Sequence, residues 1–385
     1  MQTFGDIVPD SSRADRTRSY NSKDFKDIVG NEEDWKFLPL NRLAGLDKRD
    51  TQLNASIALP QADGDAKVEL INRNNELIGQ AGTPEDLVSA KAWESFKQAV
   101  FIDIPESKEL DQVAIVHLED FLGEPQAVHI VIRAGKFSKG TVILNHKGKA
   151  EVACNVEIIV EDSAQLTVVS LQDFDDDAVF VASQQAKVGR DAYFKHINIT
   201  LGGDLIRLTP TAVLNAPGSE VDMYGMYFAD AGQYQEHRSY IDHADENCKS
   251  NVMYKGALQG KEAHTVWVGD VLIRKEAEGT DTYELNRNLI LTDGARADSV
   301  PNLEIETGVI EGAGHASTTG RFDDEHLFYL QSRGIEEEIA RRLVVRGFLN
   351  EIIQKIGDSQ TEEILRAKVD IELGNEPEVD IEEAN

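Results

Sequence analysis

The middle of the chain is a long succession of short β-forming segments. From near Gln112 onward, runs such as QVAIVHL, GTVILNH and HTVWVGDVLI follow one another for about two hundred residues, with no convincing helix between them. Gly, Asn or Asp separates most of them at intervals of about 8–14 residues, which predicts an all-β domain. That length exceeds the usual β-sandwich, and propeller signatures are missing. A solenoid, which stacks strands along a long axis, accommodates the length best, although the sequence shows no clean repeat.

The region before these strands is less regular. Residues 1 to about 30 are polar with mixed charge, and we expect them to be loosely held. The run TPEDLVSAKAWESFKQAVF predicts a helix that starts at Thr83, with Thr83 as its cap and Pro84 in its first turn.

Two helices are predicted after the β region. Asp323 and Asp324 are placed to cap a short helix over residues 325–331, and Gly334 ends it. A second helix starts near Glu336, and its apolar residues recur mostly at three- and four-residue spacing. These residues are Ile339, Leu343, Val344, Phe348, Leu349, Ile352, Ile353 and Ile356. On pattern alone, an amphipathic cap over the β core explains this hairpin as well as a binding role does.

These changes of pattern divide the chain into four parts. Residues 1–110 form a partly helical N-terminal region and residues 111–320 the β core. Residues 321–374 form a C-terminal helical domain, which includes a further helical run, TEEILRAKVDIEL. Residues 375–385 are an acidic tail that we expect to be disordered.

The net charge of −30 excludes several classes of partner. No basic stripe survives that balance, so we expect no binding to nucleic acid or to an anionic membrane surface. No apolar run reaches transmembrane length and no signal-peptide pattern is present, so we expect a cytoplasmic protein. Cys154 and Cys248 lie far apart and form no metal-binding cysteine motif.

His315 is the first candidate for chemistry. It follows Gly312 and Gly314 where the β region meets the helices, and a neutral imidazole in such a glycine-rich turn could bind a soft or borderline metal. A histidine that only hydrogen-bonds the turn is the simpler interpretation of a lone imidazole. His237 and His243 would share one face of a continuous strand, but their spacing with Cys248 matches no standard zinc pattern.

Several long runs of this sequence resemble one known family. HASTTGRFDDEHLFYLQSRGI is similar to the C-terminal signature of the SufB/SufD family, the scaffold proteins of the SUF iron–sulfur cluster assembly system. The similarity extends from about Tyr240 to Ile353, and EDWKFLPLNRL resembles the N-terminal region of the SufD branch. Ala313 stands where SufB proteins carry a cysteine, two residues before the histidine of the signature. This substitution and the chain length favour the SufD branch.

The resemblance implies a fold, partners and site residues. It implies a mainly β protein, a right-handed parallel β-helix flanked by N-terminal and C-terminal α-helical regions. It also implies a non-catalytic scaffold subunit, assembled with SufB and a pair of SufC ATPase subunits, and a possible homodimer when SufB is absent. His315 would bind transient iron or a nascent Fe–S cluster at the SufB interface, with no cofactor held tightly by this chain alone. The residues that would dock SufC are Asp323, Asp324, Leu327, Phe328, Tyr329, Arg333, Gly334, Ile335, Leu343 and Phe348.

Two other functions remain open from the sequence. A SufB-like scaffold would hold a cluster through its own cysteines, and Ala313 argues against it. A β-helix enzyme acting on carbohydrate would use paired carboxylates such as Glu304 and Glu306, but it predicts a secretion signal that this sequence does not show.

Overall fold

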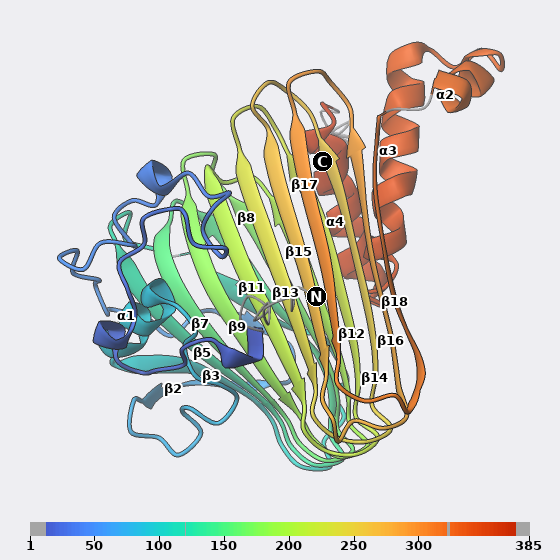
Figure 1. Ribbon diagram of the computed structural model, residues 1–385. Coiled ribbons are helices and arrows are strands. Elements are labelled where there is room, and N and C mark those ends of the chain that lie inside the picture. Colours follow the sequence, from blue (N-terminus) through green and yellow to red (C-terminus); the bar gives the residue numbers. More distant parts are fainter. Residues whose placement is uncertain (1–12, 120, 322–323, 375–385) are drawn as a thin grey trace, which may run out of the picture.

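The chain folds as a parallel β-solenoid of about 8 turns (Figure 1). The computed structural model describes residues 13–119, 121–321 and 324–374. Each turn adds one strand to each of two nine-stranded sheets, which we call sheet A and sheet B. The prediction of a mainly β, parallel β-helical protein with helical regions at both ends is confirmed.

Sheet A comprises, in spatial order, β17 (Arg296–Ile305), β15 (His264–Ile273), β13 (Tyr234–His243), β11 (Leu205–Leu214), β9 (Val179–Val188), β7 (Glu151–Val160), β5 (Gln126–Ala134), β3 (Gln98–Ile104) and β2 (Lys67–Asn72). Sheet B comprises β1 (Ala62–Asp63), β4 (Ala114–Leu118), β6 (Lys139–Gly148), β8 (Gln165–Phe174), β10 (Tyr193–Leu201), β12 (Glu220–Ala229), β14 (Lys249–Leu258), β16 (Thr280–Ile290) and β18 (Ile310–Arg321). Neighbouring strands are parallel, apart from the β1–β4 and β2–β3 pairs at the N-terminal end.

The main hydrophobic core lies between the two sheets. Every second residue of a strand points inward, as Val142 and Leu144 do on β6, and Val142 lies beside its register partner Val168 on β8. Because the sheets are covered on their outer faces as well, many strands are buried on both sides and read as apolar runs.

Further apolar clusters cover the outer faces of the solenoid. On sheet A, the N-terminal segment and helix α1 (Leu87–Ser95) pack through residues such as Trp35, Leu43 and Val88. On sheet B, helices α3 (Glu337–Ile353) and α4 (Ser359–Glu372) pack through residues such as Leu349 and Leu365. Figure 1 shows these two coverings on opposite sides of the solenoid.

The N-terminal segment lies against sheet A from Arg13 onward, and Arg13 itself is buried. The expectation that residues 1 to about 30 are loosely held stays a prediction. The local structure of this segment is limited to the 3₁₀ turns η1 (Arg13–Asp15), η2 (Ser22–Asp24) and η3 (Leu40–Arg42). Ion pairs of Arg13 and Arg16 hold the first part of this segment, and apolar packing of residues such as Trp35 and Leu43 holds the rest.

The helix predicted from Thr83 is shorter than expected. It begins at Leu87, because Asp86 accepts a hydrogen bond from the Ser89 amide at 2.8 Å and forms a capping box. Residues after Phe96 form β3 instead of continuing the helix, since they pair with β2 and β5. Pairing with neighbouring strands overrides the local helical pattern.

The C-terminal helices follow the prediction closely. Helix α2 (Asp324–Gln331) is followed by a turn that includes Gly334, whose φ of +83° is accessible to glycine without strain. Helices α3 and α4 follow. The predicted acidic tail 375–385 lies outside the described residues. No helix in the part of the chain that the structure describes is long and apolar enough to cross a membrane.

Candidate functional site

His315 lies in β18, the last strand of sheet B, and not in a turn as the sequence predicts. Pairing with β16 keeps this glycine-containing segment extended, and Glu284 is the register partner of His315. No turn of the solenoid follows β17 and β18 among the described residues, so both strands end their sheets.

The side chain of His315 faces the interior side of β18. Its neighbours two residues away show the direction: Ala313 packs against the interior core, and the Ser317 hydroxyl donates to Ser299 of β17 at 2.7 Å. Side chains alternate along a strand, so His315 shares this face. It is nevertheless exposed, because the end of the solenoid is open there.

Glu284 is a buried carboxyl beside His315 that the sequence analysis did not single out. It is 1% exposed, and neither of its carboxyl oxygens has a hydrogen-bond partner among the described residues. Burial, together with the negative charge of Asp270, raises the pKa of Glu284 to about 8. Polar residues occupy alternate positions of β16, but only the strand register shows that they point inward.

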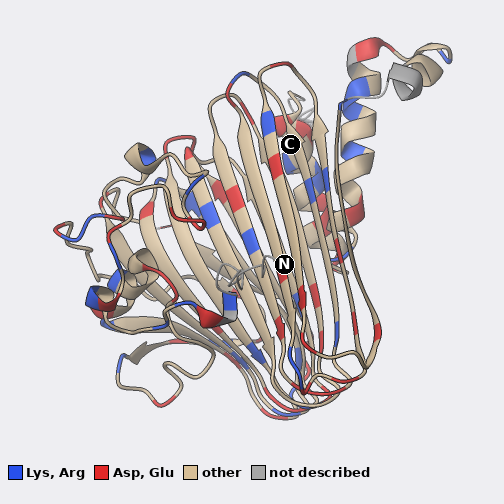
Figure 2. Ribbon diagram, viewed as in Figure 1, with Lys and Arg blue, Asp and Glu red and all other residues tan. Residues whose placement is uncertain are grey.

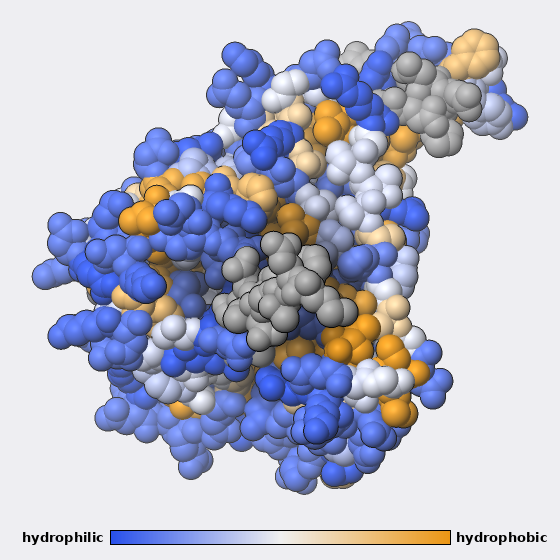
Figure 3. Space-filling model, in the orientation of Figure 1, coloured by the Kyte–Doolittle hydropathy of each residue, from blue (hydrophilic) through white to orange (hydrophobic). Residues whose placement is uncertain are grey.

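The second part of the candidate site is the end of the hairpin α2–α3, which projects beyond the solenoid (Figure 1). Among the side chains of the hairpin that the structure describes, four large apolar ones are exposed: Phe328 (72% exposed), Tyr329 (54%), Ile339 (47%) and Leu343 (44%). We call these four residues the hairpin surface. In Figure 3, hydrophobic patches appear on this projection and along the edge of the solenoid where β17 and β18 lie.

The other predicted docking residues are placed less uniformly. The Arg333 guanidinium lies 4.6 Å from the centre of the Tyr329 ring, next to exposed Gly334, and Ile335 is half-buried. Phe348 is half-buried at the base of α3, where the Lys255 ammonium lies 4.5 Å from its ring centre. Asp323 and the side chains of Asp324 and Leu327 lie outside the described part of the structure.

Charged contacts anchor the base of the hairpin to sheet B. The Lys255 ammonium donates to the Phe348 carbonyl at 3.1 Å and pairs with Glu351, which lowers the pKa of that carboxyl. Lys195 donates to the Lys355 carbonyl at 3.0 Å. The projecting end of the hairpin therefore extends from a firmly attached base.

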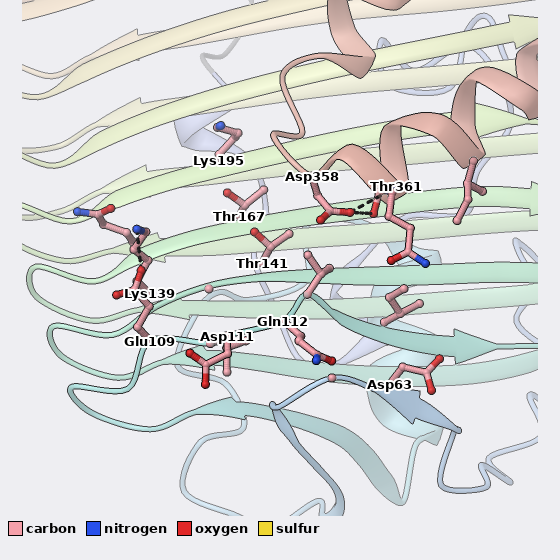
Figure 4. Close-up of a pocket in the computed structure, with 18 of the residues that line it drawn as sticks. Asp63, Glu109, Asp111, Gln112, Lys139, Thr141, Thr167, Lys195, Asp358 and Thr361 are labelled. Carbon is pink, nitrogen blue, oxygen red and sulfur yellow. Dashed lines mark hydrogen bonds and ion pairs between the residues drawn. The ribbon is translucent and has the colours of Figure 1, made fainter.

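A polar groove of about 810 Å³ lies between the start of α4 and the outer face of sheet B (Figure 4). Thr141, Thr167 and Lys195 come from the sheet, and Asp358 caps α4 by accepting from the Thr361 amide at 2.8 Å. Neither His nor Cys is among its lining residues, so the groove itself offers no soft metal donor.

The other histidines and cysteines singled out in the sequence are core residues. His237 and His243 do share the inward face of β13, where burial lowers the pKa of each to about 3. Cys154 and Cys248 are free and buried, and burial raises the pKa of both thiols. Within the described ranges, no group of three or more His, Cys, Asp or Glu residues could hold a metal ion.

Comparison with known proteins agrees with this architecture. Residues 118–348 match the family model described as SUF system FeS cluster assembly, SufBD core domain. An iron–sulfur cluster assembly SufBD family protein of Mycobacterium leprae is 47% identical over 364 residues, covering 92% of this chain and 93% of that protein. A SufBD family protein of Mycobacterium tuberculosis is 45% identical over 364 residues, covering 92% of this chain and 91% of that protein. The iron–sulfur cluster assembly protein SufD of Escherichia coli is 27% identical over 176 residues, 46% of this chain and 41% of that protein. The chain therefore belongs to the SufBD family of the SUF iron–sulfur cluster assembly system.

Proposed function

We propose that this chain is a non-catalytic, SufD-type scaffold subunit that acts with a SufB-type subunit and the SufC ATPase in the cytoplasm. The observation that carries the proposal is the exposed imidazole of His315 on the last, uncovered turn of the solenoid. In this role the chain presents His315 to iron or a nascent cluster, which is the cargo of the assembly rather than a resident cofactor.

The open end of the solenoid supports a partner at this position. β17 and β18 each have one unpaired edge, and the inward-facing Leu303 and Ala313 are only partly buried there. Exposed strand edges and interior apolar groups are covered in stable proteins, by a cap or by another chain. We assign this end to the SufB-type subunit, and to a second copy of this chain when that subunit is absent.

A single imidazole ligand does not suffice to bind an iron–sulfur cluster tightly. Iron–sulfur clusters are held mainly by several thiolates, and Cys154 and Cys248 are both buried with the pKa of each thiol raised. The thiolates must then come from the facing subunit. Buried thiols and a single exposed imidazole therefore favour a shared assembly site over a chain that holds a cluster alone.

The hairpin surface supports a second partner. Exposed aromatic and aliphatic side chains on a projecting, firmly based element are typical of protein interfaces. We assign this surface to SufC. The rigid solenoid would transmit the ATP-driven conformational change of SufC to the open end at β17 and β18.

The proposal is tested by co-purification with SufB and SufC, followed by anaerobic cluster reconstitution with the wild type and His315→Ala. His117→Ala is a matched control, because His117 lies on β4 at the opposite end of sheet B. We expect all three proteins to bind SufC and only His315→Ala to lose cluster assembly. Normal assembly by His315→Ala would remove His315 from the site, and failure to bind SufB and SufC would overturn the proposed role.

A further inference from the structure

Glu284 differs from the other inward-facing residues of β16. Thr282 bonds to Ser250 at 2.6 Å, the Asn286 amide donates to the Tyr227 hydroxyl at 2.9 Å, and Asn288 is likewise hydrogen-bonded. Glu284 lies between these residues with both carboxyl oxygens unpartnered among the described residues, although it is 1% exposed. A buried polar group without a partner costs free energy, so its presence calls for an explanation.

The surroundings leave space for this carboxyl. The facing residue on β15 is Gly269, and a Cβ atom there would lie 2.7 Å from Glu284 Oε1 and 2.3 Å from the Trp267 ring. Any larger residue at position 269 would therefore collide with the carboxyl and the indole. The Glu284 carboxyl therefore fits in the interior because Gly269 has no side chain.

The open end of the solenoid is directly beside this carboxyl. His315 is the register partner of Glu284 on β18, and the two side chains point to the same side of sheet B. Adjacent strands lie about 4.8 Å apart, so a carboxylate oxygen and an imidazole nitrogen from neighbouring positions can reach one ion at the usual ligand distance of about 2.0–2.2 Å. A metal ion that enters from solvent would meet the exposed His315 first and the buried Glu284 next.

We infer that Glu284 and His315 together form an acceptor site for a divalent transition-metal ion, Fe²⁺ in the assembly reaction. This inference rests on the proposed function, which assigns only His315, and adds a carboxylate ligand from the same chain. One imidazole and one carboxylate are a borderline and a hard donor, a pair that suits Fe²⁺ better than a soft ion such as Cu⁺. The remaining coordination positions are open to water or to the facing subunit.

The test is an anaerobic titration of the purified full-length chain with Co²⁺, whose visible absorption reports its ligands, repeated with Fe²⁺. The variants are Glu284→Gln, His315→Ala and the double variant. Asp281→Asn is the matched control, because Asp281 is an exposed carboxylate on the outward face of the same strand. Glutamine keeps the size of the side chain, and circular dichroism verifies that each variant is folded.

We expect saturable Co²⁺ binding by the wild type and by Asp281→Asn. Glu284→Gln and His315→Ala should each weaken it at least about tenfold, and the double variant should bind no better than either single variant. Wild-type affinity in a folded Glu284→Gln protein, or no saturable binding by the wild type, would overturn the inference. Cluster reconstitution and SufC capture test the proposed function separately, because they do not depend on metal binding by the isolated chain.

Discussion

The Arg13 guanidinium donates to the Asp270 carboxylate at 3.1 Å, which fastens the start of the described chain to β15 near the open end of the solenoid. The contact belongs to a larger ion-pair network on the outer face of sheet A. Its members are Arg13, Arg16, Asp34, Glu85, Arg207, Glu236, Arg238 and Asp270. Figure 2 shows the acidic and basic positions of the middle strands lying side by side beneath the N-terminal segment.

Removing the central carboxylate of this network should destabilise the fold. Glu236 is buried between Arg207 and Arg238, with the Arg238 guanidinium at 3.1 Å, and it accepts from the Tyr234 hydroxyl at 2.7 Å. Burial alone would raise the pKa of Glu236, but the two guanidinium charges hold it below its usual value. Glu236→Gln removes the charge that faces Arg207 and leaves Arg238 with Asp34 alone, and we expect a loss of about 3–5 kcal/mol in the free energy of unfolding.

Denaturant titration measures that loss. Glu220→Gln is the control, because Glu220 forms an exposed pair with Lys249 at 3.7 Å and should change stability by less than about 1 kcal/mol. Equal midpoints for the two variants would show that the buried network contributes no more than a surface ion pair.

The hairpin surface can be tested by placing a charge on it. Leu343→Asp should weaken SufC binding by tenfold or more, about 1.4 kcal/mol, because an aspartate in an apolar interface must lose its hydration. The helix should persist, since Leu343 is exposed. Binding is measured by calorimetry and folding by circular dichroism, with Ile371→Asp on α4 as an exposed apolar control. A folded Leu343→Asp protein with unchanged SufC affinity would remove the assignment.

The interior of the solenoid should not tolerate added volume at Gly256. A Cβ atom at this position would lie 1.9 Å from the Tyr227 ring, whose hydroxyl donates to Asn288 at 2.7 Å. We expect Gly256→Ala to lower the free energy of unfolding by about 1–3 kcal/mol through overpacking. Gly308→Ala, where nothing lies within 4 Å of the added atom, should leave the thermal midpoint nearly unchanged. Similar midpoints for both variants would contradict the tight packing described for Tyr227.

Glu284 should make the stability of the metal-free chain depend on pH. Burial and Asp270 raise its pKa from 4.5 to about 8, so between these values the folded chain binds more protons than the unfolded chain. The free energy of unfolding must then fall as pH rises through this window, by at most about 1.4 kcal/mol per pH unit for this one group. Denaturant titrations in the presence of a chelator should show this fall in the wild type and a smaller one in Glu284→Gln. Parallel pH profiles would mean that Glu284 is not held as a neutral acid.

The sequence alone determined those features that depend on local pattern. The succession of β segments, helix α2 and the apolar spacing in α3 follow from the propensities and periodicities of adjacent residues, and the structure contains each of them. The sequence motif around His315 likewise indicates the family without any tertiary contact.

Only the tertiary structure decided which strands pair and which way their side chains point. The residues after Phe96 have a helical pattern but form β3 because β2 and β5 lie beside them. His315 lies in a strand because β16 supplies the hydrogen bonds for β18, and Glu284 becomes its neighbour only through that register. Arg13 is buried because its partner Asp270 lies far away in the sequence. Backbone preference is a property of neighbouring residues, whereas strand register and burial depend on segments distant in the chain, so the sequence could indicate the solenoid but not the composition of its open end.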